Sequence, residues 1–122
     1  IGVEKDEKKA FEWTLKAAND GDAEAQKLVG GMYLQGIGVG KDEKKAFEWT
    51  VKAAKNGDSG GMYYVGLCLE DGIGVAQDKT KAFEWFMKAA NNGNADAKQK
   101  LEESYSKTTT QSNSGSLGCV VQ

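Results

Sequence analysis

Apolar and small residues recur at helical spacing in two different patterns that alternate along the chain. The broader pattern combines small and aromatic residues with intervening Lys and Glu, and in mid-chain it consists of Ala46, Phe47, Trp49, Val51, Ala53 and Ala54. The second pattern is a narrower stripe made of Ala23, Ala25, Val29, Met32 and Tyr33. Side chains three or four positions apart share one face of an α-helix. Each pattern therefore predicts a helix with one buried face.

Capping residues set the limits of these helices. Asp42 is a suitable N-cap, and Glu43 follows in the first turn, where the helix dipole favours a carboxylate. Gly57 stands where a left-handed residue would end that helix, and Gly36 ends the preceding stripe. Copies that start at Asp6 and Asp78 follow the same plan. We expect six helices, covering residues 4–20, 22–35, 42–56, 58–71, 78–92 and 94–106.

A 36-residue unit is written three times in this sequence. The triplet Ile1-Gly2-Val3 returns as Ile37-Gly38-Val39 and again as Ile73-Gly74-Val75. A fixed period of this length is typical of stacked supersecondary units. It predicts an all-α fold built from stacked two-helix repeats. Residues present once per repeat are expected to maintain the repeat, whereas catalysis needs its groups once.

Glycine at equivalent helical positions predicts where helices cross closely. Gly30 and Gly66 occupy such positions, and the third copy has Glu102 instead. A charged side chain cannot enter a tight crossing without a large desolvation cost. The solenoid is therefore expected to span residues 1–106, and the polar residues 107–122 to form a disordered, flexible tether.

Composition excludes several classes of function. All 16 basic residues are lysines, the net charge is −2 and histidine is absent. Nucleic-acid binding is therefore disfavoured, as is chemistry that needs a histidine base or ligand. We expect no catalytic residue, no cofactor and no metal. Cys68 and Cys119 do not form a disulfide framework, which indicates a reducing, cytoplasmic setting. Because the chain begins in mid-repeat, we interpret it as the C-terminal piece of a longer protein.

The repeated residues resemble the Sel-1-like repeat family, a relative of tetratricopeptide repeats. The resemblance covers residues 1 to about 106 and is carried by Ala23-x-Ala25, Val29-Gly30, Tyr33, Gly36-Ile37-Gly38-Val39, Asp42, Lys45-Ala46, Trp49 and Ala53-Ala54-x-x-Gly57. It implies a right-handed αα-superhelix that serves as a scaffold or adaptor for other proteins, and it implies no reaction. Some bacterial members carry paired cysteines in each repeat, a pairing that this sequence lacks.

Four features that look chemical have structural alternatives. The segment from Gly36 to Lys41 suggests a phosphate-binding loop, but Asp42 follows where Ser or Thr is needed, so we expect a turn. Cys68 lies on an apolar stripe and is expected to be a buried, inert thiol. Three repeated glutamates are expected to be solvated: Glu12, Glu48 and Glu84. Three repeated tryptophans are either ligand platforms or, as we expect, fillers of the seam between paired helices: Trp13, Trp49 and Trp85.

Positions that vary between copies are candidates for partner binding. In related solenoids the corresponding helices line a concave groove. We predict a partner-contacting patch formed by Lys27, Leu34, Tyr63, Tyr64, Leu67 and Glu70. For any one of these residues, local packing or solvation is the alternative.

The last four residues carry a different signal. Cys119-Val120-Val121-Gln122 fits a C-a-a-X box of the farnesylated type. It predicts lipidation at Cys119 and peripheral attachment to the cytoplasmic face of a membrane. A single prenyl chain without a polybasic stretch attaches weakly and reversibly. The alternative is a chance cysteine in a polar tail.

Together these features predict a non-enzymatic scaffold that binds other proteins. Sel-1-like repeats that end in a C-a-a-X box also resemble fungal regulators of chitin synthase, which implies a chitin-synthase activator as a specific version. The repeat region of a kinase-linked signalling protein is another version. A hydrolase of the kind reported for bacterial repeat proteins is the enzymatic alternative. The lack of histidine and of paired cysteines disfavours it.

Overall fold

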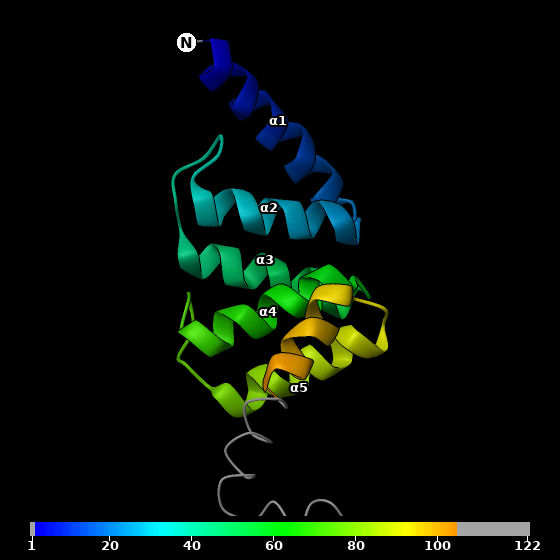
Figure 1. Ribbon diagram of the computed structural model, residues 1–122. Coiled ribbons are helices and arrows are strands. Elements are labelled where there is room, and N and C mark those ends of the chain that lie inside the picture. Colours follow the sequence, from blue (N-terminus) through cyan, green and yellow to red (C-terminus); the bar gives the residue numbers. More distant parts are fainter. Residues whose placement is uncertain (1, 105–122) are drawn as a thin grey trace, which may run out of the picture.

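The computed structural model describes residues 2–104, which form helices joined by short turns (Figure 1). The labelled helices are α1 (Gly2–Asn19), α2 (Ala23–Gln35), α3 (Glu43–Lys55), α4 (Ser59–Asp71) and α5 (Lys79–Asn91). A further helical segment covers residues 95–104, and no strand occurs in the described part of the chain. The predicted all-α solenoid is confirmed. The predicted domain end at residue 106, the segment 107–122 and Cys119 lie outside the described residues.

Helices α1 to α5 follow one another down the molecule in chain order, and each packs mainly against its neighbours in sequence (Figure 1). Helices α1, α3 and α5 each carry one repeated tryptophan, so we call them the tryptophan helices. We call α2, α4 and residues 95–104 the intervening helices. The closest associations pair α2 with α3 and α4 with α5. The repeat therefore stacks mainly through contacts between successive helices.

Aspartate caps and left-handed glycines define the helix ends, as predicted. Asp42 accepts a hydrogen bond from the backbone N–H of Lys45 at 3.0 Å, and Asp78 caps α5 in the same way. Gly36 ends α2 in the left-handed conformation with φ 74°, and Gly57 has φ 95°. The segment after Gly36 is thus a helix-capping turn, which confirms the turn interpretation over a phosphate-binding loop.

The predicted cap at Asp6 is wrong, because α1 already begins at Gly2 and runs through Asp6. In the later copies, the turn before the capping aspartate packs on an earlier tryptophan helix. The described residues contain no such helix before α1. The same sequence therefore continues as helix in the first copy and forms a turn in the next two.

Each of these turns packs against the start of the tryptophan helix that lies two helices earlier. A Cβ atom at Gly38 would overlap the carbonyl oxygen of Glu7 and lie 2.9 Å from the Cβ of Phe11. A Cβ atom at Gly74 would overlap the carbonyl oxygen of Glu43 in the same way. Both glycines also have positive φ angles, 73° and 72°. Glycine is thus required here both by conformation and by close approach.

The predicted close crossings occur where α2 meets α3 and where α4 meets α5. A Cβ at Gly30 would lie 2.6 Å from the Cγ2 of Thr50, and one at Gly66 would lie 2.5 Å from the Cε1 of Phe86. Glu102, the third equivalent, is exposed. The glycines thus allow the helices of two successive pairs to approach closely, as the sequence indicated.

Two hydrophobic clusters form the core. The first is centred on Phe11, Ala18, Ala25 and Val29. The second is larger and consists of Ala54, Met62, Val65, Leu69, Ala82, Phe86, Ala89 and Ala97. Most of these residues are alanines or small aliphatics, which permits close helix packing. Phe11 and Phe86 supply the large buried rings.

The expected position of the tryptophans in the helix seam is correct for two of the three. Trp49 packs partly buried against the first cluster and Trp85 against the second. Trp13 is 70% exposed, so the prediction is wrong there. The cause is context, because Trp49 and Trp85 pack on cores that lie before them in the chain. Within the described residues, no such core precedes α1.

Candidate functional site

An apolar groove lies between α2 and α4, with α3 beneath it. Its volume is about 530 Å³. Buried Ala46 and Thr50 of α3 contribute to its lining, and the Thr50 hydroxyl is satisfied because it donates to the carbonyl of Phe47 at 2.8 Å. Its apolar lining side chains are Leu28, Met32, Leu34, Ile37, Tyr64, Leu67 and Ile73. We call this hollow the groove.

Four of the six residues predicted to contact partners line the groove. They are Lys27, Leu34, Tyr64 and Leu67. Tyr64 is 44% exposed, so its ring is available to a bound molecule. The structure thus brings together residues that the sequence could only place on separate helices.

The two remaining predicted residues lie elsewhere. Tyr63 lines no described hollow and instead packs against Phe86, with ring centroids 5.8 Å apart. Burial is the first cause of a raised Tyr63 pKa, followed by the charge of Asp96. Glu70 lies in a second hollow, where it forms an ion pair with Lys100 at 3.0 Å. Neither residue contributes to the groove.

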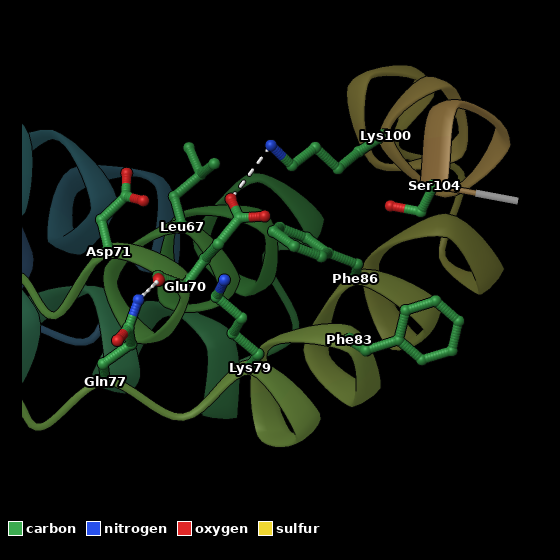
Figure 2. Close-up of a pocket in the computed structure, with 9 residues that line it drawn as sticks. All are labelled: Leu67, Glu70, Asp71, Gln77, Lys79, Phe83, Phe86, Lys100 and Ser104. Carbon is green, nitrogen blue, oxygen red and sulfur yellow. Dashed lines mark hydrogen bonds and ion pairs between the residues drawn. The ribbon is translucent and has the colours of Figure 1, made fainter. Parts of the chain in front are cut away.

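The second hollow is a pocket of about 520 Å³ between α4, α5 and residues 95–104. We call it the second pocket (Figure 2). Figure 2 shows Lys100 reaching across it to Glu70, while Gln77 donates to the backbone carbonyl of Glu70 at 2.7 Å. The hydrogen bond from Lys100 to Glu70 is the main cause of a raised Lys100 pKa. This pocket is lined by Leu67, Glu70, Asp71, Gln77, Lys79, Phe83, Phe86, Lys100 and Ser104.

The groove and the second pocket occupy equivalent places in successive repeats. Six lining positions of the groove reappear 36 residues later in the lining of the second pocket. The pairs are Gly31 and Leu67, Leu34 and Glu70, Gln35 and Asp71, Thr50 and Phe86, Tyr64 and Lys100, and Cys68 and Ser104. The apolar Leu34 and Tyr64 are therefore replaced by the ion pair of Glu70 and Lys100. One backbone arrangement thus presents two chemically different surfaces.

Cys68 has the properties of a packing residue. Its side chain is buried, and desolvation, with smaller contributions from Glu43 and Asp71, raises its pKa to about 11. A thiol with so high a pKa is a poor nucleophile at neutral pH. The prediction of a buried, inert thiol is confirmed, and Cys68 offers no support for a hydrolase.

The repeated lysines and glutamates of the tryptophan helices face solvent. Glu12, Glu48 and Glu84 are exposed, as expected. The Nζ atom of Lys52 lies 4.2 Å from the ring centroid of Trp49, and Lys88 stacks on Trp85 at 4.5 Å. These cation–π contacts cover the outer tryptophan faces and leave little of them for a ligand.

Several lining residues were missed by the sequence reasoning. Ile37 and Ile73 line the groove from the turns, but their presence in every copy suggested a purely structural role. Leu28 varies between copies and is 49% exposed, so its variability was an available signal. Phe83 gave no signal, because phenylalanine recurs at this position in every copy. Lys79 replaces the glutamate of the other two copies, so this change of charge was an available signal.

Residues 2–104 contain no group of three or more His, Cys, Asp or Glu side chains that could hold a metal ion. None of the helices described is long and apolar enough to cross a membrane.

The fold and the two hollows define a helical-repeat solenoid. The Sel1 repeat family model matches residues 1–22, 23–58 and 59–94, and the chain belongs to this family. Proteins built from Sel1 repeats are protein-interaction scaffolds and are generally non-enzymatic. No curated protein matches the chain.

Solved structures of Sel1-repeat proteins share the fold. A Sel1 repeat protein from Oxalobacter formigenes is 44% identical, with a TM-score of 0.74, over 77% of this chain and 71% of that one. Cysteine rich protein B of Helicobacter pylori is 30% identical, with a TM-score of 0.70, over 73% and 67%. The protective antigen c5321 of uropathogenic Escherichia coli is 36% identical, with a TM-score of 0.78. This chain is covered over 83% in that match but spans only 22% of the antigen.

Proposed function

We propose that this chain is a protein-interaction module that binds a segment of a partner protein in the groove between α2 and α4. The observation that carries the proposal is the gathering of apolar side chains from two helices and two turns around one hollow. Leu28 and Tyr64 stay 49% and 44% exposed there without a covering element. Exposed aromatic and aliphatic residues around a hollow are the usual anchors of protein interfaces.

The polar residues of the groove suit a peptide better than a small apolar ligand. Lys27 and Asp71 place opposite charges on the lining, and Gln35 adds an amide. A partner segment can satisfy such groups at its own backbone and flanking side chains, while its apolar side chains fill the hollow. At Gly31 a Cβ atom would meet nothing within 4 Å, so the backbone of a partner can approach α2 closely there. We therefore expect an extended or helical segment with two or more apolar residues.

Site-specific photo-crosslinking tests this proposal. A benzophenone amino acid at Tyr64 replaces one exposed aromatic with another, and the same group at Glu48, on the solvated face, is the matched control. We expect crosslinks from position 64 to a discrete partner, whose purified form then binds the unmodified chain. Leu34→Asp should weaken that binding at least about tenfold, because it places an unpaired charge among apolar contacts.

Two results would contradict the groove as the binding site. One is equal affinity of the purified partner for wild type and for Leu34→Asp. The other is crosslinking from position 48 alone. Circular dichroism melting of each variant separates lost binding from lost folding.

Lipidation at Cys119 is a separate proposal, and it depends on the residues Cys119-Val120-Val121-Gln122. We infer that this box directs prenylation and tethers the module to a membrane face in the cytoplasm. Labelling with an isoprenoid analogue should be lost in Cys119→Ser and also in a variant with two residues added after Gln122, because prenyl transferases need a free C-a-a-X terminus. Equal labelling of all three chains would overturn the tether.

Narrower roles rest on the resemblance alone. Recruitment of a chitin synthase and regulation within a kinase-linked protein both fit a scaffold whose groove binds a partner. Identification of the crosslinked partner distinguishes these two roles.

A further inference from the structure

The turns at Gly38 and Gly74 each pack on the start of an earlier tryptophan helix. We call the helix surface that such a turn contacts its seat. The turn at Gly38 rests on Glu7 and Phe11 of α1, and the turn at Gly74 rests on Glu43 of α3. Val39 and Val75, the residues after these glycines, pack against the two core clusters. The molecule therefore shows twice what occupies such a seat: an aliphatic–glycine–aliphatic turn whose glycine touches the helix backbone.

The equivalent seat on α5 is formed by Lys79 and Phe83, and the sequence lacks the repeated turn residues at the matching position. Thr108-Thr109-Thr110-Gln111 stands where Gly-Ile-Gly-Val would be. Thr110 holds the position of Gly38 and Gly74, at which a Cβ atom would overlap a helix carbonyl. A threonine also disfavours the positive φ angle that both glycines adopt.

The exposure of the aromatic residue at each seat shows the consequence. Phe11, beneath the Gly38 turn and the ring of Tyr33, is 7% exposed. Phe83, its equivalent on α5, is 46% exposed. The third seat opens into the second pocket, which both Lys79 and Phe83 line. Figure 2 shows Lys79 pointing from α5 into that pocket.

The charge of the third seat is reversed relative to the other two. Glu7 and Glu43 are acidic, whereas their equivalent is Lys79. Lys100 is neutralised by its ion pair with Glu70, and Asp71 also lines the pocket. Among the described residues Lys79 forms no such pair, so its ammonium group is the one available to an occupant. An occupant of this seat should therefore carry an acidic residue beside its aliphatic turn.

We propose that the second pocket binds a turn of a partner protein with the sequence pattern aliphatic–glycine–aliphatic followed by an acidic residue. Its glycine lies against the backbone at Lys79, its aliphatic side chains cover Phe83, and its carboxylate pairs with Lys79. Residues 105–122 of this chain contain no Asp or Glu side chain. The chain's own turns at Gly38 and Gly74 already occupy their own seats. The site is separate from the groove and makes a second contact point for partners.

Titration of the ¹⁵N-labelled full chain with two cyclic peptides tests the proposal. Both contain Gly-Ile-Gly-Val; one continues with Asp-Glu and the other with Lys-Lys. We expect amide shift changes centred on Lys79, Phe83 and Gln77, and a preference for the acidic peptide of about two- to fivefold, the range for one exposed ion pair. Phe83→Ala should weaken the binding of both peptides.

A charge reversal provides the decisive comparison. Lys79→Glu should invert the preference, so that the basic peptide binds more tightly. Lys81→Glu, an exposed residue of α5 that does not line the pocket, changes the net charge equally and should leave the preference unchanged. Identical effects of the two substitutions would overturn the proposal, as would shift changes confined to Tyr64 and Ile37. Leu34→Asp should not alter peptide binding. A negative result for the second pocket therefore leaves the proposed groove site standing, and a negative result for the groove leaves the second pocket standing.

Discussion

The groove and the second pocket differ in chemistry although the same repeat builds both. In the groove, Leu34 and Tyr64 face an apolar hollow floored by Thr50. One repeat later, an ion pair of Glu70 and Lys100 spans a hollow floored by Phe86. The backbone positions are shared, so the contrast comes from side chains that the repeat leaves free to vary. A solenoid can thus diversify its binding surface one repeat at a time without changing its fold.

The two hollows differ most in the residue beneath them, which is Thr50 in the groove and Phe86 in the second pocket. Phe86→Thr would give the second pocket the floor residue of the groove and remove a ring that is only 3% exposed. We expect a loss of about 3–5 kcal/mol in the free energy of unfolding, the range for large-to-small changes of buried aromatics. Urea unfolding measures it. Phe83→Ala, three residues earlier and half exposed, is the control and should cost less than about 1 kcal/mol. Equal costs would contradict the described packing.

The turn at Gly74, whose neighbour Ile73 lines the groove, gives the next largest expected effect. Gly74→Ala places a Cβ atom onto the carbonyl of Glu43 and forces an alanine to a positive φ angle, so we expect a loss of about 2–3 kcal/mol. Gly40→Ala meets no atom within 4 Å and should be neutral within about 0.5 kcal/mol. Thermal unfolding of both variants checks the pair. A tolerant Gly74→Ala would mean that the turn is not seated on α3.

Cys68 and Ser104 hold the same place in the two hollows and differ in burial. In a Cys119→Ser background, Cys68 should react with iodoacetamide at pH 8 about 100-fold more slowly than a thiol of ordinary pKa, because its pKa is raised to about 11. Its rate should rise only as the pH approaches that value. The exposed thiol created by Ser104→Cys should react at an ordinary rate, and mass spectrometry distinguishes the two sites. Similar rates would show that position 68 is accessible.

The ion pair is expected to give the smallest effect on stability. Lys100→Met should lower the free energy of unfolding by less than about 1 kcal/mol, because both partners are 30% exposed. The folded-state pKa of Lys100 is raised, so this contribution is present below the unfolded pKa and is lost as the pH rises through the raised value. Wild type and variant should therefore begin to converge above about pH 10.4 and coincide once the pH exceeds the raised pKa of Lys100. Lys98→Met, exposed on the same helix, is the control. A persistent difference at alkaline pH would assign the effect to packing.

The fold was predictable because the repeat period and the helix-capping residues determine it. Asp42, Gly36 and the repeated small residues placed the helix ends within a few residues of those observed. The prediction failed at Asp6 and Trp13, whose equivalents depend on a preceding helix. The pattern of one repeat does not show whether a preceding helix is there for its residues to pack against.

The hollows were predictable only in part. Leu34, Tyr64 and Leu67 interrupt the repeat, and such interruptions indicated a surface under separate selection for binding. A step of one residue turns a helical side chain by about 100°, which separates Tyr63 in the core from Tyr64 in the groove. The loss of the Gly-Ile-Gly-Val turn at residues 108–111 is visible in the sequence. The sequence did not show that α4, α5 and residues 95–104 enclose a pocket around Glu70 and Lys100.

The uneven burial of the three tryptophans has a spectroscopic consequence. Each repeat carries one indole: that of Trp13 is largely in water, and those of Trp49 and Trp85 rest on different cores. Emission maxima shift to the blue as an indole leaves water, so variants retaining a single tryptophan would report the opening of each core separately. The chain thus contains its own set of fluorophores for measuring whether neighbouring repeats unfold together or in sequence.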